Sequence, residues 1–218
     1  MNFEAARQNM VAQQVRPLSV NEEGILTVLG DLQREIFVPP QYAHLAYCDT
    51  DIPLMEGQTM LPPKTVGKAL QSLKIMPEDA VLEIGTGTGY VTACLGRLAK
   101  QVTSIEILEP LLTTAERNLK GARELSNIVL VQDDGVFGYE PQAPYDVIFV
   151  TGSYPLGVPG KLCEQVKVGG RIFAIIGQPP VMKAILMTRT KEHWTTQYLF
   201  ETVVPPLFHA PQPQSFEF

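Results

Sequence analysis

The sequence has few of the residues on which disulfide frameworks and metal sites depend. Only three cysteines and three histidines occur among its 218 residues. Cys48, Cys94 and Cys163 are far apart and form no C-x-x-C pair, and the histidines show no metal-ligand spacing. We therefore expect neither disulfides nor a bound metal, and this cysteine usage is typical of the reducing cytoplasm.

Charge and long apolar runs are scarce as well. Charged residues make up 18% of the chain, and the net charge of −6 argues against a general nucleic-acid-binding surface. The first residues, MNFEAARQNM, lack the apolar core of a secretory signal, and no run approaches the roughly 18 apolar residues that span a membrane. We expect a soluble, cytoplasmic protein that binds neither nucleic acid nor a membrane.

Apolar periodicity separates a helical N-terminal part from an alternating part. Residues 1–40 have helical spacing, with a possible capping box from Ser19 to Glu22, and residues 41–63 are interrupted by prolines and glycine. A short helix is expected next, with Val66 and Leu70 on its apolar face. The N-terminal part is therefore expected to be a helical extension of the main domain.

From residue 80 onward, strand-like runs alternate with helical patterns. The runs are 80–84, 101–107, 127–131, 145–150, 170–176, 184–190 and 196–204, and a short helix is expected at 159–166. The alternation predicts an α/β fold, a doubly wound, mostly parallel, seven-stranded sheet of the Rossmann type. The last two runs predict an antiparallel hairpin at the sheet edge, and their order in the sheet stays open.

The stretch VLEIGTGTGY, residues 81–90, places a glycine-rich turn after the first of these strands. A dinucleotide fingerprint, G-x-G-x-x-G, would need glycine where Tyr90 stands, and the phosphate loop G-x-x-x-x-G-K-[ST] does not occur. Instead Glu83 precedes the first glycine by two residues. This pattern favours a ligand that has a cationic amine and no phosphate.

Two more acids follow the next strands. Glu106 closes the second strand, where its carboxylate could accept both hydroxyls of a ribose, and Asp134-Gly135 follows the third, where a carboxylate and a backbone N–H could bind adenine. The loops after parallel strands meet at one edge of the sheet. Each feature alone could be a plain turn or helix cap, but together they predict a site for S-adenosylmethionine.

The sequence resembles the protein-L-isoaspartate O-methyltransferase family over nearly its whole length. The resembling stretches are RQNMVAQQVRP, FVPP followed by AYCDTDIPL, GQTMLPP, VLEIGTGTGY, DDGVFGYEPQAPYDVIFVTG and VKVGGRIFAIIGQ. The resemblance implies methyl transfer from S-adenosylmethionine to the carboxylate of isoaspartyl residues in damaged proteins, which promotes their repair. The motif [DN]-P-P-[YF] of many amine methyltransferases is absent after the fourth strand, where Val150-Thr151-Gly152-Ser153 stands.

The resemblance and the strand-end positions give the candidate site. The expected donor-binding residues are Gln58, Pro63, Lys64, Glu83, Ile84, Gly85, Thr86, Gly87, Gly89, Glu106, Ile107, Asp134, Gly135 and Thr151. As catalytic residues, on the acceptor side, we expect Thr59 and Leu61, which occupies the family's serine position. The expected segments are residues 1–63 (helices and substrate-side loop), 64–210 (methyltransferase domain) and 211–218 (tail).

Leu61 departs from the family, whose loop G-x-Q-T-I-S-x-P carries a serine at this position. The resemblance implies that the serine hydroxyl lies close to both donor and acceptor, and leucine would add an apolar branch there. Three hypotheses stay open: a weakened repair enzyme, a paralogue with another acceptor, or a non-catalytic donor-binding protein. The fold alone would also permit a nicotinamide oxidoreductase.

The tail offers a separate hypothesis. Phe216 and Phe218 are two residues apart, so in an extended segment both would point to one side and could dock in a groove. A tail without fixed structure is equally compatible with this composition.

Overall fold

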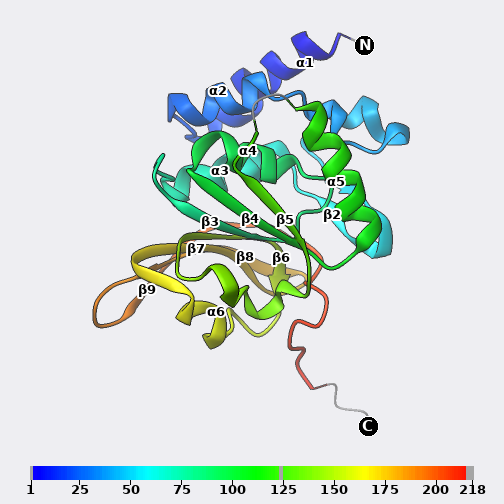
Figure 1. The fold of residues 1–218 in the computed structure, drawn as a ribbon. Helices are drawn as coiled ribbons and strands as arrows, with labels where there is room; N and C mark the ends of the chain where they lie inside the picture. The colour runs from blue at the N-terminus through cyan, green and yellow to red at the C-terminus, as the bar shows by residue number, and fades with distance from the viewer. Residues whose placement is uncertain (1, 123–124, 215–218) are drawn as a thin grey trace.

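In the computed structural model, which describes residues 2–122 and 125–214, the chain is built on one large twisted sheet (Figure 1). Within the described residues its seven strands have the order β5-β4-β3-β6-β7-β8-β9. Their bounds are β3 Ala80–Ile84, β4 Gln101–Glu106, β5 Ile128–Gln132, β6 Tyr145–Tyr154, β7 Val166–Gln178, β8 Val181–Arg189 and β9 Trp194–Glu201. The predicted seven-stranded α/β fold is confirmed.

The strand directions divide the sheet into two parts. Strands β5, β4, β3, β6 and β7 run parallel, whereas β8 and β9 continue from β7 as antiparallel neighbours. The predicted edge hairpin is therefore confirmed, and its strands follow chain order. The strand order reverses at β3, because β4 lies on one side of β3 and β6 on the other. At such a point a doubly wound sheet opens a crevice at its carboxyl edge.

Helices cover both faces of the sheet. Helices α3 (Pro63–Leu73), α4 (Tyr90–Leu98) and the N-terminal helices lie on one face, and α6 (Gly160–Glu164) lies on the other (Figure 1). Helix α5 (Glu109–Gly121) packs along β4 and β5. Each face of the sheet contributes to a separate apolar cluster of buried residues among those described.

The N-terminal segment is helical but irregular. It contains α1 (Phe3–Met10), α2 (Glu23–Asp31) and, between them, a π-helical turn followed by a 3₁₀ turn that ends at Leu18. Helix α2 packs against α3 and α4, so this segment shares its core with the sheet. None of the helices in the described part of the chain is long and apolar enough to cross a membrane.

The predicted capping box is wrong. Ser19 adopts a left-handed conformation (φ 65°) beyond the 3₁₀ turn, and Glu22, the N-cap residue of α2, makes no side-chain capping bond. The oxygen of Gln71 on α3 instead accepts from the N–H groups of Asn21 and Glu22. A long-range side chain therefore satisfies the backbone donors that a local serine was expected to satisfy.

The loop before α3, expected to be irregular, contains a small ladder. Strand β1 (Ile52–Pro53) pairs with β2 (Thr59–Met60), and the turn between them includes positive φ angles at Glu56 (51°) and Gly57 (69°). The ladder leads directly into α3. It brings the Gln58–Leu61 stretch to the carboxyl edge of the large sheet.

The chain returns to this edge after β9. Ser153 N, near the end of β6, donates to Pro205 O at 3.1 Å, and Leu207 N donates to Ser153 O at 3.1 Å. Residues 205–208 therefore lie beside the ends of the parallel strands. Phe216 and Phe218 fall outside the described residues, so their docking stays a prediction.

Candidate functional site

A cavity opens at the carboxyl edge of the sheet. Its walls come from the loops after β3, β4, β5 and β6, from the Gln58–Leu61 loop, and from the returning C-terminal segment. The predicted residues that line it are Gln58, Thr59, Leu61, Ile84, Gly85, Thr86, Gly87, Glu106, Ile107, Asp134, Gly135 and Thr151.

Four of the expected donor-binding residues do not line this cavity. Pro63 is buried at the start of α3, and Lys64 pairs instead with Asp49, at 2.6 Å between Nζ and Oδ2. Gly89 is the N-cap of α4, where an added Cβ would lie 3.3 Å from the Cβ of Ala115. The fourth is Glu83, which lies behind the glycine turn.

The glycine turn is held by the ends of two neighbouring strands. The N–H groups of Gly85 and Thr86 both donate to Ile105 O, at 2.9 and 3.2 Å. Thr151 Oγ1, at the end of β6, donates to the carbonyl oxygen of Gly85 at 2.7 Å. Gly85 has φ 91°, and an added Cβ would lie 2.2 Å from Thr151 Oγ1, so only glycine fits this turn.

Glu106 lies at the end of β4 and is 5% exposed. Its Oε2 accepts from Gly87 N at 2.8 Å and its Oε1 from Leu108 N at 3.0 Å. Burial raises the pKa of this carboxyl, and the N–H donors partly oppose that rise. The backbone thus fixes the carboxylate on the cavity wall, where its remaining lone pairs could accept from ligand hydroxyls.

Asp134 caps the turn after β5. Its Oδ1 accepts from Val136 N at 3.0 Å, and its Oδ2 lies 2.8 Å from His209 Nδ1. His209 does not line the cavity, whereas its neighbour Phe208 does. At the adjacent Gly135, an added Cβ would lie 3.0 Å from Ile84 Cγ2 and 3.1 Å from Ile105 Cγ2, so the chain approaches the sheet closely there.

Sequence reasoning missed several lining residues. These are Arg34, Leu54, Met60, Thr88, Tyr90, Val91, Ile105, Leu111, Asp133, Val136, Gly152, Pro205, Leu207 and Phe208. Thr88 and Gly152 could have been found as neighbours of predicted residues. Pro205, Leu207 and Phe208 carry no strand-end signal, because the segment reaches the cavity only through its return across β6.

Glu83 supports the turn and does not contact the cavity. It is fully buried, and its Oε2 accepts from Thr92 Oγ1 at 2.5 Å and from Ser104 Oγ at 2.6 Å. Ser104 Oγ in turn lies 2.6 Å from Thr86 Oγ1 on the glycine turn. Glu83 therefore lies outside the cavity in which it was expected to meet a cationic amine, and it acts on the turn through this network.

Glu83 should make stability depend on pH. Burial raises the pKa of its carboxyl from 4.5 to about 8, so the folded protein holds a proton there that the unfolded chain releases. The free energy of unfolding should therefore fall as pH rises between these values. Between about pH 6 and pH 8.5, we expect the free energy of unfolding of wild type to fall by roughly 1–3 kcal/mol more than that of Glu83→Gln, which has no such proton to release. Urea unfolding of both proteins at both pH values measures this difference. An equal change in the free energy of unfolding of wild type and Glu83→Gln would contradict the prediction.

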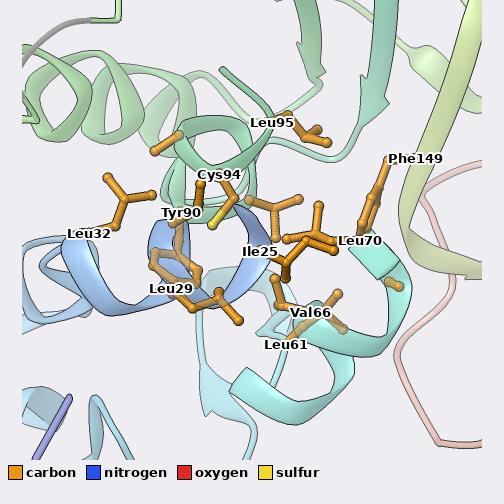
Figure 2. Close-up of a cluster of buried hydrophobic side chains, with 14 of the residues drawn as sticks. Ile25, Leu29, Leu32, Leu61, Val66, Leu70, Tyr90, Cys94, Leu95 and Phe149 are labelled. Atoms are coloured by element: carbon orange, nitrogen blue, oxygen red, sulfur yellow. The ribbon is translucent and has the colours of Figure 1, made fainter. Parts of the chain in front are cut away.

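Leu61 lies between the cavity and the apolar core. It is 3% exposed, and Figure 2 shows its side chain in the cluster that includes Ile25, Leu29 and Val66. The leucine side chain thus packs into the core cluster, although the residue also lines the cavity, and the expected apolar branch in the acceptor space stays a prediction. The carbonyl oxygen of Leu61 accepts from Arg34 Nη2 at 2.7 Å.

Known proteins resemble this chain in sequence and in structure. The sequence profile of the protein-L-isoaspartate(D-aspartate) O-methyltransferase family matches residues 5–207. A protein-L-isoaspartate O-methyltransferase of Synechococcus sp. is 34% identical over 212 residues, covering 94% of this chain and 86% of that protein. One from Methanoculleus marisnigri is 40% identical over 171 residues, covering 78% and 77%.

Solved structures agree. A protein-L-isoaspartate O-methyltransferase superimposes with a TM-score of 0.78 at 26% identity, covering 91% of this chain and 65% of that longer chain. A putative protein-L-isoaspartate O-methyltransferase from Plasmodium falciparum, solved with S-adenosyl-L-homocysteine, has a TM-score of 0.80 at 16% identity and covers 92% and 97%, which supports the fold. With its fold, its strand-end motifs and its relatives in agreement, the chain belongs to the protein-L-isoaspartate(D-aspartate) O-methyltransferase family.

Proposed function

We propose that this protein methylates the side-chain carboxylate of L-isoaspartyl residues in damaged proteins, with S-adenosylmethionine as donor, and so takes part in protein repair. The observation that carries the proposal is the convergence of two motif groups on one cavity. The glycine turn, Glu106 and Asp134 form one wall, and the Gln58–Leu61 loop forms another. Membership in the family over residues 5–207 supports the acceptor class.

The residues present fit the donor. The glycine turn leaves open the space that a Cβ at Gly85 would fill, and the fixed carboxylate of Glu106 can accept from the two ribose hydroxyls. Asp134 can accept from the adenine amino group, and the N–H of Gly135 can donate to the ring. When bound, S-adenosylmethionine supplies an electrophilic methyl group, which no residue of the chain has to generate.

The acceptor side needs orientation more than acid–base chemistry. A free carboxylate has a pKa near 4, so it is already a nucleophile at neutral pH and needs no general base. Fixing the carboxylate oxygen in line with the methyl group can lower the barrier by about 7–11 kcal/mol. We assign this orientation to the loop that carries Thr59 and Leu61.

We further propose that residues 64–210 bind the donor, that residues 1–63 complete the acceptor side, and that the protein works in the cytoplasm. Cys48, Cys94 and Cys163 are all free thiols, which a reducing compartment would preserve.

A peptide assay tests the function. The protein is incubated with tritiated S-adenosylmethionine and an isoaspartyl peptide, beside the same peptide with a normal aspartyl residue. We expect label in the isoaspartyl peptide alone. Calorimetric titration with S-adenosyl-L-homocysteine and with NAD provides the control, and a preference for NAD would replace the methyltransferase proposal with an oxidoreductase.

A methyltransferase with a different acceptor is the second candidate, and Leu61 favours it. In the family this position carries a hydroxyl near the reacting groups, whereas here the side chain packs into the core. Donor binding without label in the isoaspartyl peptide would support this candidate over the repair function.

Leu61→Ser separates the two candidates. Because residue 61 borders both core and cavity, a serine hydroxyl there can face the acceptor, and a hydrogen bond to a charged group is worth about 1.5–3 kcal/mol. We expect kcat/KM for the isoaspartyl peptide to rise about tenfold or more. We also expect the free energy of unfolding to fall by about 2–5 kcal/mol, because the core loses a leucine side chain. Kinetics should therefore be measured well below the melting temperature. An inert variant that still binds donor would favour a different acceptor.

A further inference from the structure

Arg34 is a buried cation that has no acidic partner among the described residues. Its side chain is fully buried, and within the described part of the chain no carboxylate lies at ion-pair distance from it. Its Nη1 has no hydrogen-bond partner among the described residues. Burial lowers the pKa of this guanidinium. An unpaired buried charge is costly, and an apolar side chain of similar volume would fill the space at less cost.

The contacts of Arg34 join three separate stretches of the chain. Its Nε donates to Ala46 O at 2.8 Å, and its Nη2 donates to Leu61 O at 2.7 Å. Its Cζ lies 4.5 Å from the centre of the Tyr90 ring, a cation–π contact. Ala46 precedes the β1–β2 ladder, Leu61 follows it, and Tyr90 begins α4 directly after the glycine turn.

The loop between Ala46 and Leu61 has little structure of its own to hold it. Its ladder has two residues in each strand, and its turn includes Glu56 in a left-handed conformation. Thr59, Met60 and Leu61 of this loop line the cavity, so the position of the loop shapes the cavity wall. A displacement of about 1 Å in such a site can slow a reaction about a hundredfold.

We propose that Arg34 is a positioning residue for methyl transfer, whose guanidinium clamps the acceptor loop at Ala46 and Leu61 against the Tyr90 ring beside the glycine turn. The clamp fixes the distance between the acceptor carboxylate and the donor. The kinetic part of this inference rests on the proposed function, whereas the structural part concerns the loop alone.

Arg34→Lys tests the clamp because it keeps the charge and removes the two-pronged donor geometry. The matched control is Arg171→Lys. Arg171 also donates to two backbone carbonyl oxygens, those of Leu73 and Lys74, but it does not line the cavity. Thermal melting first compares the stability of both variants with that of wild type.

The first readout is amide hydrogen exchange without donor, followed by mass spectrometry. We expect peptides that cover residues 52–61 to exchange about tenfold or more faster in Arg34→Lys, and to be unchanged in Arg171→Lys. The second readout is kinetic. With an isoaspartyl peptide, kcat should fall about ten- to a hundredfold in Arg34→Lys, while the Kd for S-adenosyl-L-homocysteine changes less than about threefold.

Wild-type exchange of residues 52–61 in folded Arg34→Lys would overturn the proposal. Faster exchange throughout the molecule, matched by Arg171→Lys, would also overturn it, since it would show a general structural role. If Arg34→Lys does not fold, Tyr90→Leu removes the aromatic face of the clamp, and the same local increase in exchange is expected. An inactive wild type would contradict the proposed function, and the exchange result would still decide whether Arg34 holds the loop.

Discussion

Gly85→Val is expected to weaken binding of S-adenosyl-L-homocysteine more than about a hundredfold, a loss of roughly 2.7 kcal/mol or more. Gly85 has φ 91°, which valine rarely adopts, and an added Cβ would lie 2.2 Å from Thr151 Oγ1. Either the turn or Thr151 must shift, and both line the cavity. Isothermal titration calorimetry measures the change.

Gly157→Val is the matched control for this variant. Gly157 also has a positive φ (99°), but nothing lies within 4 Å of an added Cβ. It should share the backbone strain of Gly85→Val and keep wild-type affinity for S-adenosyl-L-homocysteine. Melting curves of the two variants separate loss of the site from loss of the fold. Unchanged affinity of Gly85→Val for S-adenosyl-L-homocysteine would show that the glycine turn is not part of the donor site.

Glu106→Ala is expected to lower the affinity for S-adenosyl-L-homocysteine about ten- to more than a hundredfold. A carboxylate that accepts from two hydroxyls makes charge-assisted bonds worth about 1.5–3 kcal/mol. Glu109→Ala is the control, because Glu109 is an exposed acid in the first turn of the following helix. Wild-type affinity in Glu106→Ala would show that the ribose assignment is wrong.

Glu106 also accepts from the backbone N–H groups of Gly87 and Leu108. Glu106→Ala can therefore weaken binding in two ways, by removing the contact with the ribose hydroxyls or by releasing the backbone. An analogue of S-adenosyl-L-homocysteine without ribose hydroxyls distinguishes them. If Glu106 binds the hydroxyls directly, Glu106→Ala should barely affect the affinity for this analogue. An equal loss for both ligands would assign the residue to holding the turn alone.

Gly85 and Glu106 belong to the proposed donor site, and Arg34 and Glu83 hold the loops that form this site in position. Glu83 acts through Ser104 on the glycine turn, and Arg34 acts through the Leu61 carbonyl on the acceptor loop. A catalytic strategy that depends on alignment requires such support, because the acceptor needs no proton transfer. His209, which contacts Asp134, does not line the cavity, in agreement with a reaction that needs no general base.

Local sequence patterns predicted most of the elements well. The first two parallel strands, expected at 80–84 and 101–107, lie at Ala80–Ile84 and Gln101–Glu106. Strand β6 runs four residues further than expected, to Tyr154, because its end pairs again with β7 after a register shift. The predicted capping box does not form, and the N–H of Glu22 donates to the side chain of Gln71, 49 residues further along the chain.

The direction of Glu83 could also have been anticipated. Side chains alternate along a strand, and Val81 belongs to the apolar cluster beneath α4 whereas Leu82 and Ile84 belong to the cluster on the other face. Glu83 shares the face of Val81, where it meets Thr92 of α4. Proximity to the glycines in sequence was therefore a poor guide to contact with the cavity.

The sequence by itself determined the fold class, the family and the strand-end residues of the donor site. Apolar periodicity and short motifs involve residues close together in the chain, so one sequence is enough to identify them. Only the tertiary structure decided which side chains reach the cavity. It brought Pro205–Phe208 back across β6, turned Leu61 into the core, and placed Arg34 between Ala46 and Leu61. These contacts join residues far apart in the chain, and they depend on how helices and loops pack against the sheet, which no local pattern encodes.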